Sequence, residues 1–177
     1  QLLLSEPFMF DENFRRTVVL ICEHTEENGT VGLILNKPIN LGLNDVVEGF
    51  PPFDAKVFLG GPVGTDTLQF LHSLGDAIED SLEIAKGLYW GGNFEQMKIM
   101  LGSGAIQPDQ IKFFLGYSGW SPNQLVQELK VNSWIISSAT ARHIFNSDFN
   151  LLWKEVMTGM GGVYSTMASY PENPELN

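Results

Sequence analysis

Two pairs of side chains could carry nucleophilic catalysis, which needs a hydroxyl or thiol group beside a base. Ser118 with His72 would form a serine pair, and Cys22 with His24 would form a thiol pair. Each pair suggests a small hydrolase that works in a cleft around it. No motif in the sequence couples either nucleophile to its base, so a binding protein without catalytic residues has to be weighed against this hypothesis.

Ser118 lies in a sequence close to a nucleophile elbow, the strand-turn-helix motif G-x-S-x-G of hydrolases. The spacing differs, because Gly119 directly follows the serine and Trp120 stands where the second glycine should be. A bulky residue at that position would keep strand and helix apart. We therefore favour a hydrogen-bonded serine over a nucleophile.

Cys22 and His24 lie two residues apart on an expected strand, so they would point to the same face with about 6.8 Å between their backbones. That separation is loose for a catalytic pair. A cysteine in an apolar strand is usually a small buried side chain, and we favour this interpretation. The three histidines are dispersed and the chain has one cysteine, so we expect neither a metal site nor a cofactor.

A buried strand followed by a helix is predicted for residues 111–129, and the rest of the chain is organised around it. Residues 111–115 form a short apolar run that suits a strand covered on both faces, and Gly116 ends it. A hydroxyl, a proline and a glutamine then give three helix-start signals: Ser121, Pro122 and Gln124. The turn between strand and helix is expected to expose three side chains: Tyr117, Ser118 and Trp120.

Several predicted strands end in small or polar residues, as they would if their ends met at one cleft. These ends are at Lys37, Gly60, His72 and Gly116. Glycine pairs can bring backbone N–H groups close to an anion. Lys37 is one of few isolated cations, although it could equally pair with a nearby carboxylate. The candidate ligand-binding residues are Asn36, Lys37, Gly60, Gly61, His72, Ser73, Tyr117, Ser118 and Trp120.

Strand and helix signals alternate irregularly along the chain, without a fixed repeat, which predicts a single α/β domain over residues 1–177. Further strands are expected at residues 2–4, 17–24, 31–35, 57–59, 68–72, 88–90 and 134–137. Helices are expected at residues 43–47, 94–101 and 149–157, and a loose tail from residue 170 onward.

The chain is acidic, with 10 basic against 21 acidic residues and a net charge of −11. Its cations are scattered apart from Arg15 and Arg16, so no basic stripe could follow a phosphate backbone, and direct nucleic-acid binding is not expected. A protein partner or a small anionic metabolite fits this charge better.

The expected location is the cytoplasm. The apolar stretches are far shorter than the roughly 20 residues that span a bilayer, so we expect no membrane segment. The single cysteine agrees with a reducing compartment. The chain begins at Gln1, which is no initiator, so native residues are expected to precede it.

Five stretches in order along the chain resemble the YqgE/AlgH family of bacterial proteins. The most specific is G-Y-S-G-W at residues 116–120, followed by N-S-W at 132–134. The others lie at residues 14–24, 32–38, 58–63 and 71–73. This resemblance implies a mixed sheet that is partly closed into a barrel and flanked by helices. It also implies a regulatory role, because the family carries the label of transcriptional regulators.

The favoured function is a binding or regulatory module without enzymatic activity, which acts on transcription indirectly. The resemblance supports the regulatory role, and the acidic surface argues against direct contact with DNA. The alternative is the small hydrolase, with its cleft near Ser118 and His72 or near Cys22 and His24.

Overall fold

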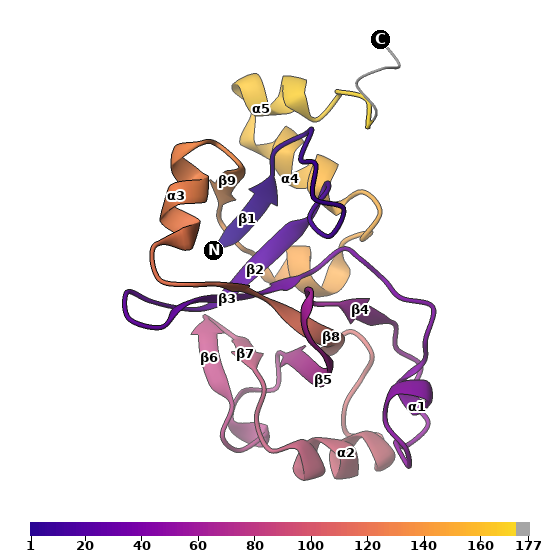
Figure 1. The fold of residues 1–177 in the computed structure, drawn as a ribbon. Coiled ribbons are helices and arrows are strands. Elements are labelled where there is room, and N and C mark those ends of the chain that lie inside the picture. The colour runs from indigo at the N-terminus through magenta and orange to yellow at the C-terminus, as the bar shows by residue number, and fades with distance from the viewer. Residues whose placement is uncertain (173–177) are drawn as a thin grey trace.

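The computed structural model describes residues 1–172, apart from the side chain of Asn146. Its centre is strand β8 (Ile111–Trp120), which belongs to both halves of a nine-stranded sheet (Figure 1). The first half of β8 pairs with β5 (Val63–His72) and with β4 (Val57–Leu59). The last three residues of β8 pair with β3 (Gly29–Ile34). One strand therefore holds the two half sheets together.

The sheet is mixed and open. Its strands follow the order β6-β7-β5-β8-β3-β2-β1-β9, and β4 pairs with β8 beside this path. Only the β4–β8 pair is parallel among the described strands. The remaining strands are β1 (Leu2–Ser5), β2 (Val18–Thr25), β6 (Leu82–Ala85), β7 (Leu88–Trp90) and β9 (Trp134–Ser137).

The partial closure into a barrel that the resemblance implied is not seen. The edge strands β6 and β9 form no pair with each other in the described part of the chain. The reason is visible in Figure 1, where the two half sheets extend from β8 to opposite sides.

Helices cover both faces of the half sheet that contains β1, β2 and β3. On one face lie α4 (Leu152–Met160) and α5 (Gly162–Met167), and on the other lies α3 (Gln124–Lys130). The second half sheet packs against α1 (Leu43–Val46) and α2 (Phe94–Gly102). Two short turns complete the fold, the 3-10 helix η1 (Gly75–Ala77) and the π-helical turn η2 (Arg142–Asn146).

Successive residues of the central strands face different helix layers. In β1, Leu3 packs on the α3 side and Leu4 on the α4 side. In β8, Phe113 packs with α2, whereas Phe114 packs with α4. Strands buried on both faces need apolar residues at every position, which explains the nearly unbroken apolar runs of the sequence. The prediction that residues 111–115 form a strand covered on both faces is confirmed.

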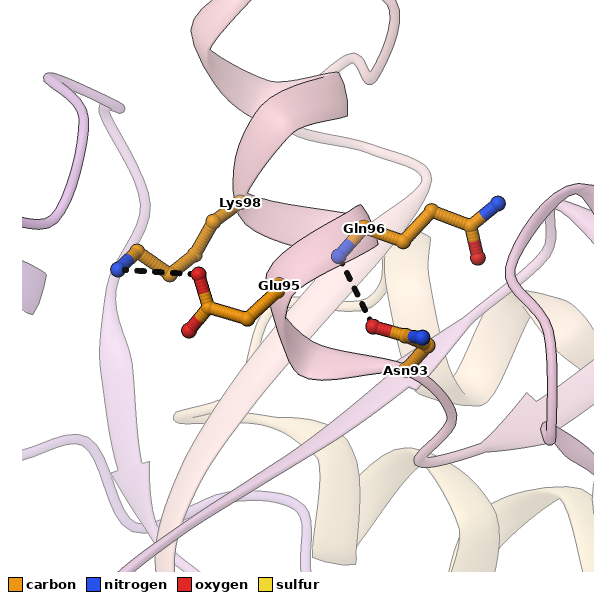
Figure 2. Close-up of polar contacts among 4 residues, drawn as sticks. All are labelled: Asn93, Glu95, Gln96 and Lys98. Atoms are coloured by element: carbon orange, nitrogen blue, oxygen red, sulfur yellow. Dashed lines mark hydrogen bonds and ion pairs between the residues drawn. The ribbon is translucent and has the colours of Figure 1, made fainter.

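Helix α2 begins at the predicted position, residue 94, directly after a capping asparagine. The side chain of Asn93 accepts a hydrogen bond of 3.0 Å from the backbone N–H of Gln96 (Figure 2). One turn on, Lys98 and Glu95 form an ion pair at 3.8 Å. Such an exposed pair contributes at most about 0.5 kcal/mol, so the start of the helix is set by the cap. The helix includes Gly102 and does not end before it.

Strand β8 runs five residues further than predicted. Gly116 adopts a left-handed conformation with φ +65°, which bends the strand without ending it. Helix α3 consequently begins later, after Asn123 at φ +66°. The predicted contact of the capping box is nevertheless made, because the Gln124 side chain accepts a 3.0 Å hydrogen bond from the backbone N–H of Ser121. It closes a turn ahead of the helix rather than its first turn.

The other elements match their predictions with shifted ends. The strands at 57–59, 88–90 and 134–137 are confirmed with the predicted bounds. The helix expected at 149–157 lies at Leu152–Met160. The elements β6, η1, η2 and α5 were not predicted. No helix within residues 1–172 is long and apolar enough to cross a membrane.

The two ends of the described chain are tied together. The Arg16 guanidinium donates hydrogen bonds to the carbonyls of Tyr170 (2.5 Å) and Pro171 (2.9 Å) and lies 4.7 Å from the ring centroid of Trp153. The indole of Trp153 donates a buried 3.0 Å hydrogen bond to the carbonyl of Ser5. The segment from residue 170, expected to be loose, is thus held at its first two residues, and residues 173–177 lie outside the described part.

Glycines permit a very close crossing of β4 and β8. A Cβ atom on Gly60 would lie 2.3 Å from the carbonyl oxygen of Gly116, and one on Gly61 would lie 2.2 Å from the backbone carbon of Tyr117. A Cβ on Gly116 would lie 2.7 Å from the carbonyl oxygen of Gly61. The backbones touch directly, and the N–H of Gly60 donates to the carbonyl of Leu115 at 2.8 Å.

We expect Gly116→Ala to destabilise the protein by about 3 kcal/mol or more, because left-handed strain adds to a clash with rigid backbone. Gly104→Ala is a matched control: Gly104 has φ +73° and nothing within 4 Å of its Cβ position, so only the strain of about 1 kcal/mol applies. Urea unfolding measures both. Equal losses in the two variants would show that the crossing does not constrain the fold.

Candidate functional site

Ser118 is a buried structural residue of the sheet. Its backbone pairs with Gly32 of β3, and its hydroxyl donates a 3.0 Å hydrogen bond to the carbonyl of Gly60. The side chain is 0% exposed. The prediction of an exposed turn at this position is wrong, because the bend at Gly116 lets the strand continue. The preference for a hydrogen-bonded serine agrees with the geometry.

His72 lies at the opposite end of β8 from Ser118. It pairs with Ile111, and Ser118 is seven residues further along the strand, which corresponds to roughly 20 Å. Because β5 runs antiparallel to β8, the end of β5 is directed away from Ser118. The Ser118–His72 pair of the hydrolase alternative is therefore not brought together.

The His72 ring takes part in a local hydrogen-bond network. Its Nδ1 accepts from the backbone N–H of Leu74 (3.3 Å), so Nε2 carries the proton and lies 2.9 Å from Ser81 Oγ and 3.1 Å from the carbonyl of Gly91. Burial lowers the pKa of His72. A neutral imidazole with both nitrogens engaged joins β5 to the segment before α2.

Cys22 and His24 are also not coupled. The register of β2 against β3 shifts between Ile21 and Glu23, so Cys22 lies on a bulge and turns into the core, where it is 7% exposed. Burial raises the pKa of the Cys22 thiol to about 12. His24 is exposed, and its Nδ1 lies 2.7 Å from the hydroxyl of Thr30. The interpretation of Cys22 as a buried apolar side chain is confirmed.

Strand direction decides which candidate ligand residues meet. The parallel pair of β4 and β8 places Gly60 and Gly61 beside Tyr117 and Ser118, but as packed backbone without a hollow between them. His72 and the adjoining Ser73 lie at the other end of β8. The idea of converging strand ends requires parallel neighbours, and most pairs here are antiparallel.

Asn36 and Lys37 hold the loop before β2. The Asn36 side chain accepts from the backbone N–H of Val18 and donates to the carbonyl of Arg16, each at 2.9 Å. The Lys37 ammonium donates to the backbone carbonyl of Glu12. Burial lowers the pKa of Lys37. Its partner is thus a main-chain oxygen, which neither of the two interpretations of Lys37 anticipated.

Trp120 belongs to a cluster that sequence reasoning did not identify. The indole N–H groups of Trp120 and Trp134 donate to the same carboxylate oxygen of Glu128, at 2.9 and 2.7 Å. Gln124 donates to the other oxygen at 2.9 Å. Phe14 packs on both indole rings, with centroids 6.0 and 5.4 Å away. These contacts fix α3 on the sheet, and both indoles are only 4% exposed.

A hollow lies away from these residues, between η2 and α4. It measures about 600 Å³, within the range of small-molecule sites. We call it the η2–α4 groove, and it is lined by Arg142, His143, Leu151, Lys154, Glu155, Thr158 and Gly159. The helix at residues 149–157 was predicted from the sequence. Its polar residues Lys154, Glu155 and Thr158 are exposed, and their helical spacing could have indicated that they share a solvent-facing side.

The groove combines two exposed cations with an unsatisfied imidazole. Arg142 and Lys154 are exposed, and Glu155 is the carboxylate among the lining residues. The Nδ1 atom of His143 is buried and has no hydrogen-bond partner within the described structure. Burial, followed by the charge of Arg142, lowers the pKa of His143. The lowered pKa favours the neutral ring, whose Nδ1 atom is left without a partner by the surrounding protein.

The Cys22 thiol should resist a disulfide-exchange reagent in the native state at pH 8. With a pKa of about 12, its thiolate fraction is about 10³-fold below that of an exposed cysteine. Dithionitrobenzoate should therefore react with Cys22 several hundred-fold more slowly in buffer than in urea, where the same chain is unfolded. Comparable rates in the two solutions would restore the thiol hypothesis.

Comparison with known proteins agrees with the fold and the motifs. A family described as AlgH-like matches residues 2–165. A UPF0301 protein of Bacteroides fragilis is 45% identical over 178 residues, which span 100% of this chain and 90% of that protein. Another, from Chlorobium phaeobacteroides, is 43% identical over 177 residues, with coverage of 100% and 94%.

Two solved structures share this architecture. The solution structure of the AlgH protein from Pseudomonas aeruginosa superposes with a TM-score of 0.76 and 28% identity, covering 96% of this chain and 92% of that one. A protein of Corynebacterium diphtheriae has a TM-score of 0.79 at 22% identity, with coverage of 96% and 90%, and shows likeness of fold alone. The chain therefore belongs to the AlgH-like family.

Proposed function

We propose that the protein is a binding module without enzymatic activity, and that its ligand is a small anion held in the η2–α4 groove. The observation that carries the proposal is the meeting of Arg142, Lys154 and His143 around one hollow of about 600 Å³. The planar guanidinium can bind a carboxylate or phosphate through two parallel hydrogen bonds.

The proposal gains weight from how the other cations are used. The chain has ten Lys and Arg residues against 21 acidic ones. Arg16 binds the carbonyls of residues 170 and 171, Lys37 binds a carbonyl, and Lys98 pairs with Glu95. Arg142 and Lys154, by contrast, are exposed and line one hollow, beside the single carboxylate of Glu155.

The expected affinity is modest. Exposed ion contacts contribute about 1 kcal/mol or less each, because water screens them. The Leu151 side chain adds an apolar wall. Together these contacts fit dissociation constants of roughly 10 μM to 1 mM.

Binding is favoured over hydrolysis by the state of the candidate nucleophiles. The Ser118 hydroxyl donates to a backbone carbonyl, and the nearest proposed base lies roughly 20 Å away along β8. The Cys22 thiol is buried with a raised pKa. Neither group meets the requirement of a nucleophile within hydrogen-bond reach of a base.

Thermal unfolding with citrate or inorganic phosphate tests the groove. At a hundredfold excess over the dissociation constant, the native state gains about 2.7 kcal/mol, which corresponds to several degrees in Tm for a chain of this size. The double variant Arg142→Gln, Lys154→Gln should lose this shift. Chloride at the same ionic strength should produce no comparable shift.

Lys86→Gln with Lys130→Gln is the matched control, since both lysines are exposed and neither lines the groove. The control should keep the full anion-dependent shift despite the same change in net charge. An equal loss of the Tm shift in both double variants would show that the shift depends on net charge alone, and it would overturn the proposal. The absence of any Tm shift in the unaltered protein with either anion would also overturn it.

A regulatory effect of such a module would pass through its ligand or a protein partner. The isolated protein should bind duplex DNA with a dissociation constant no lower than the micromolar range at physiological salt, because a net charge of −11 opposes contact with phosphates. Mobility-shift titration measures this affinity. Nanomolar, sequence-selective binding would establish a direct regulator instead.

A further inference from the structure

Lys112 of β8 is a partly buried lysine without a carboxylate partner in the described structure. Its Nζ atom donates hydrogen bonds to the backbone carbonyls of Leu35 (2.8 Å) and Ile144 (3.3 Å). The same atom lies 4.0 Å from the ring centroid of Phe58. Three fixed neighbours therefore hold the amine in one position, and none of them carries a negative charge.

The amine borders a small hollow, which we call the Lys112 hollow. It measures about 200 Å³ and shares no lining residue with the η2–α4 groove. Seven of its eleven lining residues are apolar, among them Phe58, Phe149 and Ile144. The four polar residues are Asp54, Ser147, Lys56 and Lys112 itself. A hollow of this size admits a compound of a few carbon atoms.

These surroundings favour the uncharged amine. Burial lowers the pKa of Lys112 to about 7, so about half of the molecules carry a free amine at neutral pH, compared with less than about 0.1% for an exposed lysine. The Phe58 face favours the charged form, but it does not replace the carboxylate that a buried ammonium needs.

A neutral amine also fits the observed hydrogen bonds. It has two N–H groups and one lone pair, and the two carbonyl acceptors of Leu35 and Ile144 match the two N–H groups. The lone pair is then left over. A desolvated lysine in an apolar pocket is one of the known ways to make a nucleophilic amine.

We propose that Lys112 is a reactive amine that captures a small aldehyde or ketone in the Lys112 hollow as a reversible imine. The Nζ lone pair adds to the carbonyl carbon, and a proton moves from nitrogen to oxygen to give a carbinolamine. The second N–H proton then passes to the hydroxyl group, the C–O bond breaks, water leaves, and the C=N bond forms. The step releases one water molecule, needs no oxidant or reductant, and is independent of anion binding in the groove.

Reductive trapping with propanal and cyanoborohydride tests this on the unaltered protein. The extent of alkylation of each lysine is measured by peptide mass spectrometry, with the exposed Lys86, Lys130 and Lys154 as internal references. At pH 7, Lys112 should react at least tenfold faster than these three. Its rate should reach half of its maximum near pH 7, whereas the reference rates should still be rising at pH 9.

Two controls connect the reactivity to the folded site. In urea, the advantage of Lys112 over the reference lysines should disappear. Lys112→Met should remove only this modification, while Lys56→Met, which changes an exposed lysine of the same hollow, should leave the Lys112 rate within about twofold. A Lys112 that reacts no faster than the references at pH 7, or equally fast in urea, overturns the proposal whether or not the variants fold.

Discussion

The close backbone crossing at Gly60, Gly61 and Gly116 is the constraint on which the fold depends. With side chains at these positions, β4 could not reach β8, and the parallel pair would be lost. The crossing leaves the edge of β8 beyond Gly116 free for β3, so one strand serves two half sheets. Ser118 stabilises the same backbone crossing, because its hydroxyl donates a hydrogen bond to the carbonyl of Gly60. Two residues of the motif G-Y-S-G-W, Gly116 and Ser118, are thus explained by backbone proximity.

The residues with chemical potential divide into two groups. Ser118, His72 and Cys22 are engaged in the architecture, as their burial and hydrogen bonds show. Groups that are free to meet a ligand gather around η2, with the η2–α4 groove beside Arg142 and the Lys112 hollow beside Ile144. A π-helical turn leaves its backbone irregular, which is common where a protein presents groups to a ligand.

Sequence reasoning identified the strands and helix α2 well, because periodicity and capping are local signals. The strand at 57–59 and the start of the helix at residue 94 needed no tertiary information. Sequence reasoning placed the end of the strand wrongly at Gly116. A glycine can either end a strand or bend it, and which of the two occurs depends on the neighbouring strand. Sequence reasoning also failed for the cleft, because apolar patterns do not reveal whether neighbouring strands are parallel. The Lys112 environment depends on residues 35, 58 and 144, which no local pattern connects.

The contact between Arg16 and the carbonyl of Tyr170 joins residues 154 positions apart, and it bears on how the chain acquires its structure. Strands β1 and β2 are made before the other described strands and helices, yet α3 and α4, which cover their two faces, are made much later. Until then their leucine-rich surfaces have no native cover. Folding dominated by such distant contacts is slow, and apolar surface that stays exposed meanwhile favours aggregation.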